Sequence, residues 1–162
     1  MDPKYVAAIK AGIIAAVILA MLALVNNLID YVNISFFGLS CLIFFLELAV
    51  LAGAGAMAVK MAPGLIRSLE DSLAVGAIAG AVTFILGGTI GLVLSFLFSL
   101  LKATAWDITH PISDFPEATA GSLFTGICAI CCLPVLLLII GIIGAIVGAI
   151  GAAIYYEVAG KP

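Results

Sequence analysis

A chain of 162 residues with 65% hydrophobic and 9% charged residues is not a soluble globular protein, because soluble domains carry about 25% charged residues. The net charge of -3 is small and spread along the chain, so no basic patch is present for nucleic acid. The partners that we expect are the lipid bilayer and other membrane proteins. The predicted fold is all-α, a polytopic membrane protein whose single domain covers residues 1–162.

Four apolar segments follow one another along the chain. A helix needs ~20 residues to cross a hydrocarbon core of ~30 Å. We predict four spans of at least this length, at about 5–29, 36–59, 72–101 and 134–156, which form a four-transmembrane-helix bundle.

The polar segment 102–117 separates the third span from the fourth. Asp114 followed by Glu117 is typical of a helix start, which predicts a helix from about residue 115. Pro134 removes a helical hydrogen bond and should kink or break the helix there. We therefore predict a short outer helix at about 115–132, interfacial or re-entrant, followed by the fourth span.

Small residues recur at helical spacing in every predicted span. Lipid tails are as apolar as leucine, so transmembrane helices associate where small residues allow their backbones to approach closely. The second span carries such a stripe at Ala49, Gly53 and Ala56, and the fourth has glycines at spacings of 3, 4 and 3. The helix-packing residues that we predict are Gly12, Gly53, Gly76, Gly80, Gly87, Gly91, Gly141, Gly144, Gly148 and Gly151.

The basic residues predict the orientation. Cytoplasmic loops carry an excess of lysine and arginine. One side of the predicted topology carries one basic residue, Lys102, and the other side carries five: Lys4, Lys10, Lys60, Arg67 and Lys161. We expect a multi-pass protein of the cell membrane with both termini in the cytoplasm.

Glu47 is the one ionisable residue deep within a predicted span. A carboxyl group at this depth is costly, so it should face the bundle and find a partner. One interpretation is a proton or cation site. The other is a structural hydrogen bond that ties helices together, with Asn26, Asn27, Thr83 or Ser95 as its partner.

Cys128 and Cys131 form a C-x-x-C motif, with Cys132 directly after it. At the outer end of a four-helix protein with cytoplasmic termini, this motif resembles that of the vitamin K epoxide reductase family. The resemblance implies exchange of electrons between Cys128, Cys131 and a quinone. The chain lacks the loop cysteine pair of that family. The alternative interpretation is that these cysteines are small packing residues near a kink.

Metal binding has less support in the sequence. Three cysteines at 128–132 and His110 have the donor types of a zinc site, but nothing in the loop places His110 near the thiols. Asp107, His110, Asp114 and Glu117 also form no regular helix face, because Pro111 interrupts them. We predict no metal site and no cofactor.

The stretches VGAIAGAV in the third span and IIGAIVGAIGAAIYY in the fourth resemble small, glycine-rich, four-helix membrane proteins of archaea. Those proteins are mostly uncharacterised, so the resemblance implies no activity. The function that we predict is a non-enzymatic integral membrane subunit that assembles with itself or with a larger membrane complex. The alternatives are a small proton- or cation-coupled transporter or channel that uses Glu47, and a membrane thiol–quinone oxidoreductase that uses Cys128 and Cys131.

Overall fold

The computed structural model describes residues 2–32, 37–109 and 115–159, with side chains described in 2–32, 39, 41–101, 135 and 137–159. Within these ranges all regular structure is helical. Four of the described helices are long and apolar enough to cross a membrane, which confirms this part of the predicted fold. The helices are α1 (Pro3–Tyr31), α2 (Phe37–Lys60), α3 (Leu69–Thr109) and α4 (Phe115–Val158).

Short polar residues start the two helices that begin at the end of the bundle where the termini lie. The Asp2 side chain accepts a hydrogen bond from the Lys4 backbone N–H at 3.3 Å, and Pro3 has the fixed φ that suits a first helical position. Before α3, the Ser68 hydroxyl oxygen accepts from the backbone N–H of Asp71 at 3.2 Å. This cap allows α3 to begin at Leu69, three residues before the predicted start.

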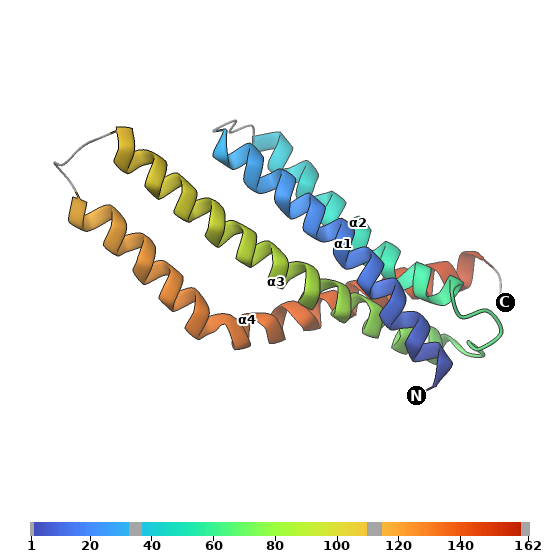
Figure 1. Cartoon of the computed structure of the whole chain (residues 1–162). Helices are drawn as coiled ribbons and strands as arrows, with labels where there is room; N and C mark the ends of the chain where they lie inside the picture. The colour runs from blue at the N-terminus through green and yellow to red at the C-terminus, as the bar shows by residue number, and fades with distance from the viewer. Residues whose placement is uncertain (1, 33–36, 110–114, 160–162) are drawn as a thin grey trace.

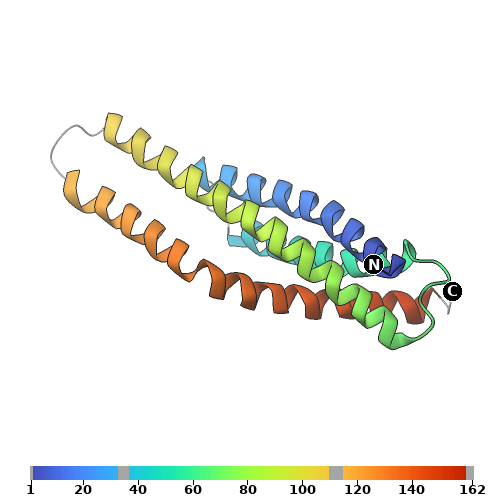
Figure 2. The same cartoon turned by 60° about the horizontal axis from the view of Figure 1, so that its bottom comes forward.

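The helix that we predicted at 115–132 is not separate from the fourth span. Residues Phe115–Val158 form one helix of 44 residues, and this helix bends near its middle, the region in which Pro134 stands in the sequence (Figures 1 and 2). Proline removes one backbone hydrogen bond and kinks a helix, but the remaining bonds hold both halves together. Of the kink or break predicted near Pro134, the helix therefore shows a bend without a break.

The four helices form two hairpins of unequal length. At ~1.5 Å per residue, α3 and α4 are about 62 and 66 Å long, whereas α1 and α2 are about 44 and 36 Å long. The α3–α4 hairpin consequently extends past the α1–α2 hairpin at one end, which we call the far end (Figures 1 and 2). Both chain termini lie at the opposite end, the terminal end.

The described core lies toward the terminal end and consists mostly of alanine. In α1 the buried residues stop at Leu19, and among the side chains described in α3, up to residue 101, the last buried one is Gly87. An ion pair joins the first turns of α1 and α3, where Lys4 Nζ lies 2.8 Å from Asp71 Oδ1. The main buried cluster comprises Ala7, Ala8, Ala11, Ala58, Val59, Ala62, Ile66, Val75, Ala79, Ala152 and Tyr156.

Candidate functional site

Helices α2, α3 and α4 meet at a group of glycines that we call the glycine crossing: Gly55 of α2, Gly76 and Gly80 of α3, and Gly144, Gly148 and Gly151 of α4. A Cβ atom on Gly80 would overlap the carbonyl oxygen of Gly144 and lie 2.9 Å from the Cα of Gly148. A Cβ atom on Gly144 would lie 2.7 Å from the carbonyl oxygen of Gly80. Glycine is therefore required on both helices, because either side chain would push the backbones apart.

Contacts of α2 with α4 complete the crossing. A Cβ atom on Gly55 would overlap the carbonyl oxygen of Gly148, and one on Gly151 would overlap the carbonyl oxygen of Ala52. On the other side of α3, a Cβ atom on Gly12 of α1 would lie 2.9 Å from the carbonyl oxygen of Ala79. Three pairs of helices, α3–α4, α2–α4 and α1–α3, thus approach each other at backbone distance.

Two buried hydroxyl groups bond between helices beside the crossing. Ser72 of α3 donates a hydrogen bond to the carbonyl oxygen of Ala152 in α4 at 3.1 Å. The hydroxyl of Thr83 lies 3.1 Å from the carbonyl oxygen of Gly12 in α1 and 2.7 Å from that of Ala79 in its own helix. Both side chains are fully buried, so these bonds form away from water and fix the position of α3 between α1 and α4.

Gly53 of the predicted α2 stripe does not pack against another described helix of the chain. It is exposed, and outside its own stretch of helix no heavy atom of the described residues lies within 4 Å of a Cβ atom placed on it. Ala49 is exposed as well. The segment AGAGAMA has small residues on every face of the helix. Leu51 is 0% exposed, and because its burial turns that face of α2 inward, Gly55 on the same face meets α4.

The remaining predicted glycines make looser contacts. A Cβ atom on Gly87 would lie 2.7 Å from Cδ2 of Leu19, a flexible side chain, and one on Gly91 would lie 3.3 Å from the Cβ of Ala23. For Gly141 the nearest atom is Cδ1 of Ile85, also at 3.3 Å. Contacts therefore loosen from the crossing toward the far end.

Glu47 lies on the face of α2 that points into the molecule. Ile43 and Leu51, one helical turn to either side, are 7% and 0% exposed, and Glu47 itself is half-buried. Among the described residues it has no hydrogen-bond or ion-pair partner. Two of the structural partners that we predicted bond elsewhere: Thr83 bonds Gly12 and Ala79, and Asn27 Nδ2 donates to the carbonyl oxygen of Ala23.

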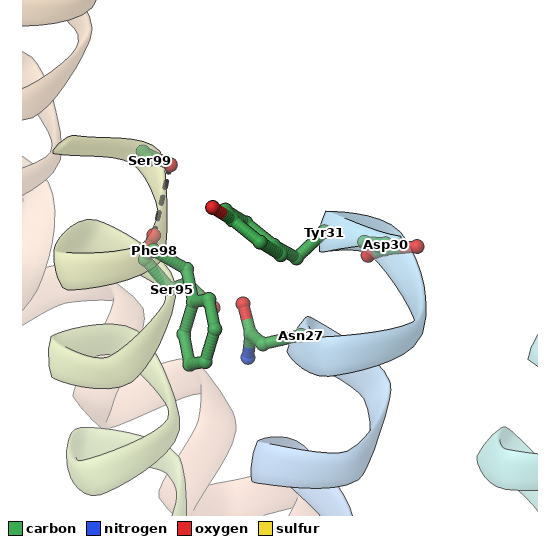
Figure 3. Close-up of a pocket in the computed structure, with 6 residues that line it drawn as sticks. All are labelled: Asn27, Asp30, Tyr31, Ser95, Phe98 and Ser99. Atoms are coloured by element: carbon green, nitrogen blue, oxygen red, sulfur yellow. Dashed lines mark hydrogen bonds between the residues drawn. The ribbon is translucent and has the colours of Figure 1, made fainter. Parts of the chain in front are cut away.

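A cavity of about 320 Å³ opens between α1 and α3 toward the far end. Figure 3 shows Asn27 and Tyr31 of α1 directed toward Phe98 of α3, and the ring centroids of Tyr31 and Phe98 are 6.0 Å apart. The Ser99 hydroxyl donates to the carbonyl oxygen of Ser95 at 2.8 Å. The residues that line the cavity are Asn27, Asp30, Tyr31, Ser95, Phe98 and Ser99.

Sequence reasoning did not identify this cavity as a site. The signal was present in Ser95 and Ser99, which are four residues apart and so lie on one face of α3. Asn27 and Tyr31 have the same spacing in α1. The sequence does not show that these two faces lie opposite each other, because that depends on α1 and α3 running in the same direction side by side in the fold.

The predicted redox residues lie outside the described side chains. Cys128 and Cys131 belong to the backbone of α4, and His110 is outside the described residues altogether. Their proposed chemistry stays a prediction. Cys41 is a free, exposed thiol in α2. Among the side chains that are described, no three histidine, cysteine, aspartate or glutamate residues gather where a metal ion could bind.

Comparison with known proteins gives no relative: no family model matches the chain, and neither a curated protein nor a solved structure is significantly similar to it.

Proposed function

We propose that this chain is a non-enzymatic integral membrane subunit that assembles, through the outer face of α2, with a second copy of itself or with another membrane protein. The observation that carries the proposal is the outward position of Ala49 and Gly53. Transmembrane helices use small residues four apart to bring backbones together. In this chain the pair is not used internally, because the glycine crossing holds α2 through Gly55.

We also propose that the protein lies in the cell membrane with both termini in the cytoplasm. Both termini lie at one end of the molecule (Figure 1). The helix ends on that side carry Lys4, Lys10 and Lys60, and Arg67 follows in the connection to α3. The positive-inside rule supports a cytoplasmic location for this end.

The test replaces Gly53 with leucine. No other described helix of the chain lies within 4 Å of the added Cβ, so Gly53→Leu should leave the monomer folded while it blocks approach of a second helix. Native mass spectrometry of protein extracted gently from its own membranes should show a complex for the natural chain and the monomer for Gly53→Leu. Circular dichroism should give the same helix content for both.

Ala74→Leu is the matched control, because Ala74 is an exposed small residue on α3, away from the proposed face. Ala74→Leu should keep the complex. A natural chain that is monomeric and partnerless in native membranes, or a complex that survives Gly53→Leu, would overturn the proposal.

A second candidate function, proton or cation coupling through Glu47, is favoured by one observation. Glu47 lies on the inward face of α2 and has no bonding partner among the described residues. Intramembrane carboxyl groups in such positions mark ion and proton paths.

Purified protein in vesicles with an imposed pH gradient tests this candidate. Coupling through Glu47 predicts proton flux that Glu47→Gln abolishes and that Glu70→Gln, a change in the first turn of α3 at the terminal end, preserves. Vesicles with natural protein that are no more permeable than empty ones would exclude the candidate. The complex measured for the subunit proposal should not respond to Glu47→Gln.

A further inference from the structure

A groove of about 530 Å³ opens on the outer surface of the bundle near the terminal end. Its volume falls within the ~300–1,000 Å³ of typical ligand pockets. Most of its lining is aliphatic, thioether or aromatic, and it comes from three helices. The residues that line it are Ile14 of α1, Ala56, Met57 and Lys60 of α2, Met61 directly after α2, and Tyr155 of α4.

Two hydrogen-bond donors that border this groove have no acceptor among the described residues. Lys60 is the last residue of α2 and of its candidate span, is exposed, and forms no ion pair with any described carboxylate. Within the described part of the chain, the Tyr155 hydroxyl also lacks a hydrogen-bond partner. A positive charge and a phenol O–H are therefore available where an apolar surface reaches the edge of the span.

We infer that this groove binds one anionic phospholipid. Its phosphate oxygens would accept hydrogen bonds from Lys60 Nζ and Tyr155 Oη, and the first part of an acyl chain would pack on Met57 and Ala56. Ala56 and Lys60 are about 6 Å apart along α2, which accommodates the first carbons of the chain below the headgroup. Flexible methionines adapt to a mobile chain, and basic residues at the membrane surface attract anionic headgroups.

Charge favours a lipid phosphate as the occupant of the groove. Lys60 is exposed and forms no ion pair with a described carboxylate, and a phosphate would neutralise it.

The experiment measures which lipid the full chain retains. The protein is equilibrated with vesicles of equal phosphatidylglycerol and phosphatidylcholine, extracted, and analysed by native mass spectrometry. One phosphatidylglycerol per chain should be retained in preference to phosphatidylcholine. Lys60→Gln should reduce that preference about fivefold. Lys10→Gln, which removes an exposed charge on α1 that does not line the groove, should leave it unchanged.

A second pair of variants tests the groove itself. Ala56→Trp should fill it and abolish lipid retention, whereas Ala74→Trp, on an exposed position of α3 outside the groove, should not. Equal retention of the two lipids by the natural chain would overturn the inference, as would equal effects of Lys60→Gln and Lys10→Gln. Loss of a dimer rather than of a lipid in Ala56→Trp would assign the groove to a second copy and overturn it as well.

Discussion

The two ends of this molecule are built from similar residues but are packed differently. Near the terminal end, glycine backbones meet, and the hydroxyl of Thr83 reaches the carbonyl oxygen of Gly12 in α1 as well as that of Ala79 in its own helix. Toward the far end, the hydroxyls of Thr89 and Ser99 bond carbonyl oxygens of their own helix, at 2.5 and 2.8 Å. In the most apolar 18-residue stretch of α3 only 6% of the residues are buried, whereas 33% are buried in the corresponding stretch of α1.

This difference shows that an apolar composition rich in small residues does not by itself close a membrane bundle. Helices approach to backbone distance only where glycines of two helices coincide, as Gly80 and Gly144 do. Beyond that point the α1–α3 pair contains a polar cavity, and α3 meets its neighbours through side chains such as Phe98. We therefore expect stability to depend on the crossing, and partner or ligand contacts to use the remaining surfaces.

The largest effect should follow from adding one methyl group at the crossing. Gly80→Ala places a Cβ atom against the carbonyl oxygen of Gly144 and 2.9 Å from the Cα of Gly148. Backbone atoms cannot rotate away, so α3 and α4 must separate. Overpacking of this kind costs about 1–3 kcal/mol. Thermal unfolding in detergent, followed by circular dichroism, should show a clearly lowered midpoint.

Gly91→Ala is the matched change toward the far end. Its added Cβ would lie 3.3 Å from the Cβ of Ala23, which a small shift of α1 accommodates. The midpoint for Gly91→Ala should stay near that of the natural chain. Equal losses at Gly80 and Gly91 would show that the far end is packed as closely as the crossing, and the contrast between the two ends would be wrong.

A smaller effect should come from removing a buried hydroxyl. Thr83→Val keeps the shape of the side chain but loses its bond to the carbonyl oxygen of Gly12. Hydrogen bonds between transmembrane helices contribute about 0.6 kcal/mol on average and at most ~1.7 kcal/mol. Reversible unfolding in mixed micelles should report a loss in this range.

Thr89→Val is the matched control, because it removes a hydrogen bond within one helix and not one between two helices. The Thr89 hydroxyl donates to Ile85 of its own helix, so its loss removes no tie to a neighbour. Stability should hardly change. If Thr89→Val were as costly as Thr83→Val, the bond to Gly12 would not be the source of the effect.

The four spans and a packing face on α1 could be predicted from the sequence because both depend on local signals. Hydropathy predicted the four spans, and small residues at helical spacing predicted a packing face on α1, where Gly12 is buried. The break at Pro134 could not be decided in this way. One missing hydrogen bond bends a helix or ends it, depending on the neighbours that cover it.

The choice between Gly53 and Gly55 depends on tertiary structure. Both lie in a run of small residues, so every face of α2 in that region allows close approach. Only the position of Leu51 in the core, together with Gly148 on α4, decides which face turns inward. Glu47 was recognised as exceptional from the sequence, but its inward position without a bonding partner among the described residues required the coordinates.

The smallest effect should follow from Lys4→Gln at the terminal end. Lys4 Nζ lies 2.8 Å from Asp71 Oδ1 and 3.9 Å from Asp2 Oδ2, but the Lys4 and Asp71 side chains are 18% and 29% exposed. Solvent and salt weaken ion pairs of this kind. We expect a drop in the unfolding midpoint smaller than that of Thr83→Val at low ionic strength. The drop should disappear in 1 M salt, where the Debye length is about 3 Å.

Lys10→Gln is the control for this measurement, because Lys10 is exposed on the same helix and forms no ion pair with the described residues. It should give no drop at either salt concentration. Lys4 Nζ also lies 5.3 Å from the centroid of the Tyr5 ring. A loss in Lys4→Gln that persists in 1 M salt would therefore assign its contribution to packing on this ring. The Lys4–Asp71 ion pair would then contribute little to the contact between α1 and α3.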